Sequence, residues 1–94
     1  MLTYKAMYKF ESDGVHAEVL DFPGAISCGR DLAEARRQLA GALVDMAEIN
    51  LLSQRPLPIP NPEVSNAEAD IEEPIHLLLT AAARVDLVPA TIAP

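Results

Sequence analysis

The first twenty residues alternate between apolar and polar side chains, which is the pattern of β-strands with one buried face. Over Leu2–Phe10 the even-numbered positions are apolar and the odd-numbered positions are mostly polar, with Met7 as the exception. A second alternation follows over residues 15–20. Asp13-Gly14 lies between the two segments and favours a tight turn. The pattern therefore predicts two antiparallel strands joined by a hairpin.

A proline and a glycine interrupt the alternation in the stretch "DFPG". Pro23 fixes its own φ and favours extended geometry at Phe22, whereas Gly24 accepts a positive φ. Residues 22–25 therefore predict a type II turn. The following "AISCG" predicts a short third strand that ends at Gly29. We expect the Phe22 side chain to close one end of a small core.

Apolar residues then recur every three or four positions up to residue 49, which is the spacing of one helical face. Asp31 followed by Glu34 is a capping-box pattern, in which the first carboxylate accepts from backbone N–H groups and the second reaches back. We expect a helix from this cap to about Leu52, with Gly41 inside it at a cost of roughly 1 kcal/mol relative to alanine. The polar side of the helix, available to solvent or to a partner, carries Arg36, Arg37, Gln38, Asp45 and Glu48.

The segment after the helix has no helical or strand periodicity. Its "PLPIPNP" places four prolines within residues 56–62, which predicts a stiff, extended connector. The acidic residues 63–73 predict a mobile surface loop. "PIHLLLTAA" restores the alternation and predicts a last strand over about residues 74–82, and residues 84–94 are expected to form a tail.

The predicted element order is β-β-β-α-β, which favours an α+β fold with two layers. One helix covers one face of a sheet and leaves the other face open. Met7 and Leu78 are predicted to give that open face apolar content. Exposed apolar patches mark interaction sites, and two-fold dimers are the commonest assembly, so we expect a homodimer or a higher homo-oligomer. A single domain over residues 1–83 accounts for all of these elements.

Charge narrows the classes of partner. The formal net charge is −7, and residues 38–94 hold eight acidic and two basic side chains. Proteins that grip phosphates cluster Lys and Arg, so direct nucleic-acid binding is not expected, whereas a basic protein partner is favoured. Cys28 is the single cysteine and no apolar run is long enough to span a bilayer, so a cytoplasmic location is expected.

Candidate chemistry in the sequence is sparse. Glu18 and Asp21 lie close together, but no further strand carboxylate completes a two-metal nuclease site. His16, His76 and Cys28 do not have the spacing of a paired metal-ligand motif. We therefore expect exposed or interface histidines, a cysteine that serves as a small core residue, and no catalytic, cofactor-binding or metal-binding residues. The protein is not expected to be an enzyme.

The stretch "VHAEVLDFPGAISCGRDLAEA", the long helix after it and the following "PLPIPNP" together resemble the HicB family of antitoxins. The resemblance covers roughly residues 1–80. It implies a partial RNase H-like fold without nuclease activity, in which the final strand lies beside the first and parallel to it. The residues that carry the resemblance are Asp21, Phe22, Pro23, Gly24, Gly29, Asp31 and Glu34.

The resemblance also implies a partner. HicB-like domains bind and inhibit HicA toxins, which are small basic ribonucleases that cleave messenger RNA. Charge complementarity predicts toxin binding through Asp45, Glu48, Glu68, Asp70, Glu72 and Glu73.

This sequence departs from the family pattern in one respect. Many HicB proteins carry a C-terminal DNA-binding domain, but only 11 residues follow Ala83 here, with a single arginine. Direct DNA binding is therefore not expected. Two alternatives to an antitoxin stay open: an orphan HicB-like protein with a structural or small-ligand role, and an autorepressor that binds DNA only together with its partner.

Overall fold

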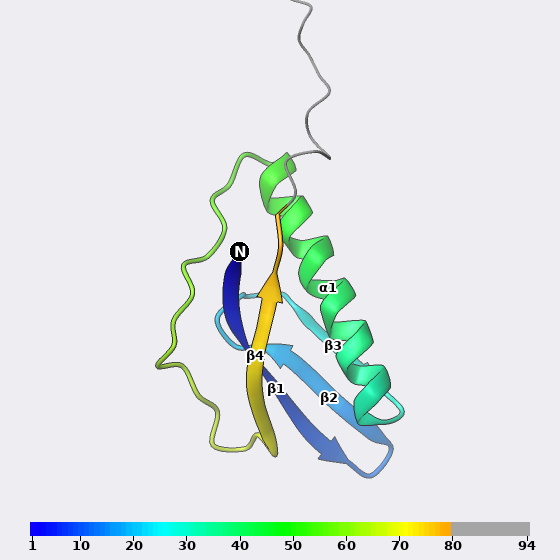
Figure 1. Cartoon of the computed structure of the whole chain (residues 1–94). Helices are drawn as coiled ribbons and strands as arrows, with labels where there is room; N and C mark the ends of the chain where they lie inside the picture. The colour runs from blue at the N-terminus through cyan, green and yellow to red at the C-terminus, as the bar shows by residue number, and fades with distance from the viewer. Residues whose placement is uncertain (80–94) are drawn as a thin grey trace, which may run out of the picture.

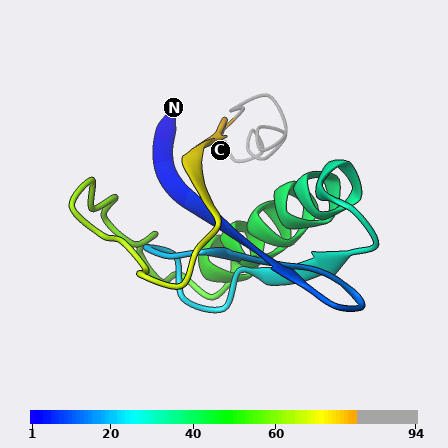
Figure 2. The ribbon, with the colours of Figure 1, turned by 90° about the horizontal axis from the view of Figure 1, so that it is seen from below.

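The computed structural model describes residues 1–79, which form one four-stranded sheet and one helix. The sheet has the strand order β3-β2-β1-β4, and every neighbouring pair is antiparallel. The helix α1 lies along one face of the sheet (Figure 1), and the view from below shows the two layers (Figure 2). The predicted α+β architecture with two layers is confirmed, whereas the predicted tail lies outside the described residues. The elements are β1 (Leu2–Glu11), β2 (Gly14–Val19), β3 (Ile26–Gly29), α1 (Leu32–Leu52) and β4 (Ile71–Leu77).

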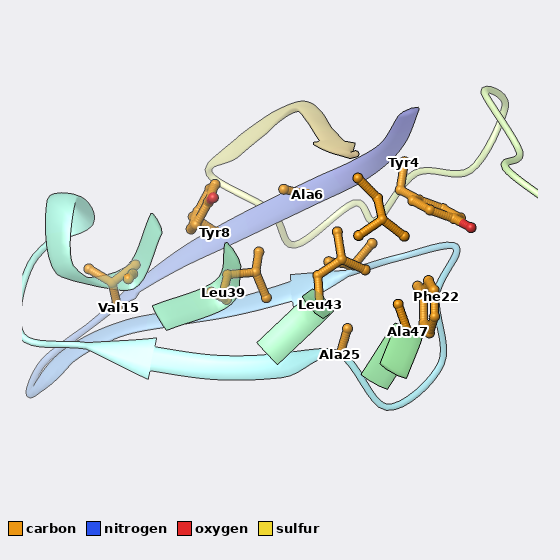
Figure 3. Packing of buried hydrophobic residues seen from close by; sticks show 13 residues of the cluster. Tyr4, Ala6, Tyr8, Val15, Phe22, Ala25, Leu39, Leu43 and Ala47 are labelled. Carbon is orange, nitrogen blue, oxygen red and sulfur yellow. The ribbon is translucent and has the colours of Figure 1, made fainter. Parts of the chain in front are cut away.

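Side chains from α1, β1 and β2 form most of the core (Figure 3). Alternate residues of the strands meet the buried face of the helix, as the two periodicities predict. Phe22 is buried and its ring packs edge-on against Tyr4, with ring centroids 5.2 Å apart, which confirms its expected place in the core. The largest fully buried side chains are Tyr4, Tyr8, Phe22, Leu39, Leu43 and Val19.

Two residues of β1 depart from their predicted environments. Phe10 lies on the helix side of the sheet but near the end of the strand, and 52% of its surface is exposed. Met7 lies on the opposite face, where it faces Glu18 and Glu72, and only 2% of its surface is exposed. The prediction that Met7 supplies exposed apolar surface to the open face is therefore wrong.

The turn and the helix start follow the sequence signals closely. Gly24 has a φ of +93°, and the Ala25 N–H donates to the Phe22 carbonyl at 3.1 Å, which confirms the type II turn. At the helix start, Asp31 Oδ1 accepts the N–H of Glu34 at 2.8 Å. Glu34 in turn accepts the N–H of Arg30, one residue before the cap, at 2.7 Å. The capping box is thus present in a slightly extended form.

The direction of β4 differs from the direction that the family resemblance implies. β4 lies beside β1, but the register from Leu2–Leu77 to Tyr8–Ile71 is antiparallel rather than parallel. α1 ends near the beginning of β1, so a strand that started there would run parallel to β1 (Figure 1). The connector instead returns along the sheet before β4 begins, and this return reverses the strand.

Polar contacts hold the connector along β1. The Tyr4 hydroxyl donates to the Pro58 carbonyl at 2.7 Å, and the Lys5 ammonium donates to the Val64 carbonyl at 3.0 Å. Further along β1, the N–H of Asp70 donates to the Tyr8 carbonyl at 2.8 Å. Prolines lack the N–H groups that a sheet ladder needs, so the connector follows the strand without pairing with it.

The bounds of β4 also correct the predicted acidic loop. The strand begins at Ile71 and ends at Leu77, whereas the sequence pattern predicted about residues 74–82. Glu72 and Glu73, which were predicted to lie in a mobile loop, are strand residues paired with β1. Pro74 is tolerated inside β4 because this strand lies at the edge of the sheet.

Candidate interaction surface

The six carboxylates predicted to bind a toxin do not converge on one surface. Asp45 and Glu48 are exposed on α1. Glu73 pairs with Ala6 and therefore lies on the helix side of the sheet, whereas Glu72 pairs with Met7 on the opposite face. Glu68 and Asp70 lie beside the end of β1, where they contact Lys9 and Phe10. A single flat partner cannot contact all six residues together.

Glu73 is engaged by a residue of the helix. Arg36 donates two hydrogen bonds to the Glu73 carboxylate, at 3.0 and 2.8 Å, and its guanidinium lies 5.8 Å from the centre of the Tyr8 ring. These bonds raise the pKa of Arg36. Burial, and then the neighbouring Glu73 carboxylate, raise the pKa of Tyr8 to about 12. Arg36, which was predicted to be solvated, thus ties α1 to β4.

Glu72 fastens the connector to the opposite face of the sheet. Its carboxylate accepts the N–H of Asn66 at 2.8 Å and the hydroxyl of Ser65 at 2.9 Å, and Lys5 lies 3.7 Å away. These donors lower the pKa of Glu72, and the Asn66 N–H contributes most. The contacts give Glu72 a structural role.

Asp70 and Glu68 fasten the last part of the connector. Asp70 Oδ2 accepts the N–H of Phe10 at 2.7 Å. Glu68 forms an exposed ion pair with Lys9 at 3.3 Å, a kind of contact that contributes little to stability. Four of the six predicted carboxylates therefore have partners within the chain.

Asp45 and Glu48 differ from these four because they form no ion pair within residues 1–79. They lie on a side of α1 where exposed residues recur at spacings of three and four. Leu52, for example, is 80% exposed. Exposed apolar side chains beside unpaired carboxylates distinguish this surface. We call it the α1 outer face, and it comprises Gly41, Val44, Asp45, Glu48, Leu51 and Leu52.

Gly41 has no packing reason within the chain. A Cβ placed on Gly41 would meet no atom within 4 Å. The close packing that could explain a mid-helix glycine is therefore absent from the described residues, although glycine here costs roughly 1 kcal/mol relative to alanine. What glycine does provide is a low point at the end of the α1 outer face that is nearer to the start of the helix.

The sequence contained part of the signal for this surface. The apolar series of the helix predicts one buried face, yet Ile49 from that series is about half exposed. Val44 and Leu51 lie outside that series and are also exposed. The helical repeat identifies the buried stripe, but only the position of α1 over the sheet shows which apolar residues fall outside it.

Asp21 serves the fold through its carboxylate. Its two oxygens accept the N–H of Lys5 and the N–H of Asn61, each at 2.8 Å. The side chain thereby joins the turn after β2, the start of β1 and the connector. Glu18 instead lies beside His16, with Oε1 and Nε2 3.2 Å apart. The two carboxylates singled out as the start of a nuclease site are thus held by different partners.

The remaining metal-ligating residue types are spread over the open face and its edges. His76 bonds to the Thr3 hydroxyl at 3.0 Å. Cys28 is exposed on β3, so the prediction of a small core residue is wrong. Within residues 1–79, no group of three or more His, Cys, Asp or Glu side chains is arranged to hold a metal ion.

Comparison with protein-family models gives no match for this chain, and comparison with curated protein sequences gives none either. Among the described residues, no helix is both long enough and apolar enough to cross a membrane. The fold and the α1 outer face are thus the observations on which a function can be argued.

Proposed function

We propose that this protein is an antitoxin-like binding module that neutralises a small basic messenger-RNA ribonuclease of the HicA type by direct contact. The proposal assigns no catalysis to the module itself. The observation that carries it is the α1 outer face, where Val44, Leu51 and Leu52 are exposed beside Asp45 and Glu48. Exposed apolar side chains with negative charge between them suit a basic protein surface.

The resemblance to HicB supports the same proposal through residues that organise the fold. Asp21 clamps the connector, Gly24 makes the turn, and Asp31 caps α1. We propose that the domain is a variant of the partial RNase H-like fold. The strand order and the helix on one face suit that fold, and the antiparallel β4 is the point at which this chain departs from the expected family topology.

Inhibition would follow from occlusion. A ribonuclease that binds RNA needs a basic surface, because neutralising phosphates supplies most of the affinity for nucleic acid. Asp45 and Glu48 would compete for that surface, while the neighbouring apolar side chains would provide contacts that RNA cannot make. The carboxylates should mainly affect the rate of association, and the apolar residues should mainly affect the rate of dissociation.

Co-expression with the adjacent reading frame tests the proposal. We expect that frame to encode a small basic protein that arrests growth alone, and we expect this protein to restore growth and to co-purify with it. Leu51→Lys should weaken both effects. Ile59→Lys is the matched control, because Ile59 is also exposed but lies on the connector. If the neighbour is neither basic nor toxic and nothing co-purifies, the proposal is wrong and the orphan role replaces it.

A further inference from the structure

The two edges of the sheet differ in their chemistry. β4 carries Pro74 and the charged Glu72 and Glu73, features that discourage a further strand from pairing. β3 has the sequence Ile26-Ser27-Cys28-Gly29, with no proline and no charged side chain. The β3 edge therefore lacks the devices that usually protect an edge strand.

The register identifies the backbone groups that β3 presents outward. The N–H of Val19 donates to the carbonyl of Ala25 at 2.9 Å, and Ser27 faces Ala17 two residues further along the ladder. In an antiparallel ladder, hydrogen-bonded pairs alternate with pairs that are not hydrogen-bonded. Ala17–Ser27 is therefore a hydrogen-bonded pair like Val19–Ala25, and Ser27 points its N–H and C=O toward β2. Ile26 and Cys28 then point theirs away from the sheet.

We propose that a second copy of this chain pairs with β3 in antiparallel orientation, so that two four-stranded sheets join into one sheet of eight strands. A two-fold axis perpendicular to the sheet does not exchange the two faces, so the helix sides of both copies lie on the same side of the joined sheet. Residues opposite each other must share a face, so a residue on the axis meets its own copy. Either Ser27 or Cys28 can occupy the axis while keeping the strands overlapped.

The helix cap selects between these two registers. With Cys28 on the axis, Ile26 would face Arg30 of the second copy and would need the Arg30 N–H as a donor. That N–H already donates to Glu34 at 2.7 Å. With Ser27 on the axis, Ile26 of one copy faces Cys28 of the other. The pairing then uses only the outward-pointing backbone N–H and C=O groups of these two residues, which bond to each other. The register therefore places Ser27 opposite Ser27 of the second copy.

Apolar contact and charge favour the same arrangement. Ile26 is 52% exposed and Cys28 is exposed on the same face, so each would pack on the other across the new pair. The contact strip itself is uncharged, which limits the repulsion expected between two chains of net charge −7. Arg30 of one copy would lie opposite Gly24 of the other, and its guanidinium is already paired with Glu34 of its own chain.

Mass measurement tests the pairing on the full chain. We expect sedimentation of the native protein at micromolar concentration to give a dimer, and Ile26→Lys to give a monomer. Leu78→Lys is the matched control, because Leu78 is an exposed apolar residue next to β4, on the far side of the sheet, and this variant should stay dimeric. A native monomer, or a dimer that survives Ile26→Lys, would overturn the proposal.

Cross-linking tests the register without relying on loss of assembly. Directly opposite residues that are not hydrogen-bonded have Cα atoms about 4.5 Å apart, within disulfide range, whereas diagonal ones are about 7–8 Å apart. Oxidation should therefore cross-link the double variant Ser27→Cys, Cys28→Ser, and should leave native Cys28 unlinked. Cross-linking of native Cys28 alone would contradict the register. Neither measurement needs a toxin, so both are independent of the proposed function.

Discussion

Arg36 of α1 binds Glu73 of β4 through two hydrogen bonds, at 3.0 and 2.8 Å, and lies over the ring of Tyr8. This is a bidentate arrangement, in which two parallel N–H groups of the planar guanidinium match the two oxygens of the carboxylate. It connects the helix to the strand that follows the long connector. Few other contacts join α1 and β4 directly. We therefore infer that the Arg36–Glu73 pair holds β4 in place relative to α1.

Replacing Arg36 should therefore loosen β4. Arg36→Ala should lower the urea midpoint of unfolding, and Arg36→Lys should restore only part of the loss because lysine keeps the charge but not the two-pronged geometry. Arg37→Ala is the matched control, since Arg37 is its exposed neighbour on the same helix. Equal midpoints for Arg36→Ala and Arg37→Ala would show that the pair does not hold β4.

Tyr8 should make stability fall at high pH. Its pKa of about 12 in the folded protein exceeds the ordinary value of 10.0, so the unfolded chain loses the phenolic proton first. The contribution is complete below about pH 10 and is lost as the pH rises towards 12. Tyr8→Phe should flatten this part of the curve of stability against pH. A tyrosinate absorbance titration in which the Tyr8 signal appears near pH 10 would contradict the assignment.

Two glycines should respond oppositely to alanine. A Cβ on Gly29 would overlap the backbone of Ala35 in the first turn of α1, so Gly29→Ala should destabilise by about 1–3 kcal/mol. A Cβ on Gly41 would meet nothing, so Gly41→Ala should stabilise by roughly 1 kcal/mol. Chemical denaturation of the two variants measures both effects. Destabilisation by Gly41→Ala would indicate packing at that position that the fold does not account for.

Asp21 should control the attachment of the connector. Asp21→Ala removes the acceptor of the Lys5 and Asn61 N–H groups, at an expected cost of about 1–3 kcal/mol. Hydrogen exchange should speed up at Asn61 more than at Glu63, whose N–H donates to the Asn61 side chain instead. Unchanged exchange at Asn61 would mean that the clamp does not order the connector.

The sequence was informative where structure is decided locally. Alternation located β1 and β2, Pro23-Gly24 located the turn, and the Asp31–Glu34 spacing located the start of α1. These signals depend on residues close together in the chain. These strands, the turn and the start of the helix therefore agreed with their patterns to within a few residues.

The errors concern relations between distant segments. The direction of β4 depends on how far the connector travels along β1, and that path is fixed by contacts such as Tyr4–Pro58 that no periodicity reveals. Met7 interrupts the alternation of β1 and is nevertheless buried, while Cys28 is exposed because it lies opposite His16, on the face of an edge strand that points away from α1. Burial at these positions depends on strand order, which the pattern of one strand does not contain.

The candidate surface shows the same division. Net charge predicted an acidic interface, but the sequence could not show that Glu72, Glu73, Asp70 and Glu68 have partners within the chain. The exposed half of α1 became apparent only from its position over the sheet. The candidate surface is therefore the α1 outer face, whose residues are neighbours on one helix, and not the six carboxylates that net charge suggested.

Inhibition of messenger-RNA cleavage by the purified neighbouring gene product tests the central claim most directly. We predict that cleavage stops near one equivalent of this protein, and that Leu51→Lys weakens inhibition about tenfold or more, as removal of one energetically important interface contact does. Ile59→Lys should inhibit like the native chain. Cleavage that continues at a large excess of the native protein, or full inhibition by Leu51→Lys, would contradict neutralisation through the α1 outer face.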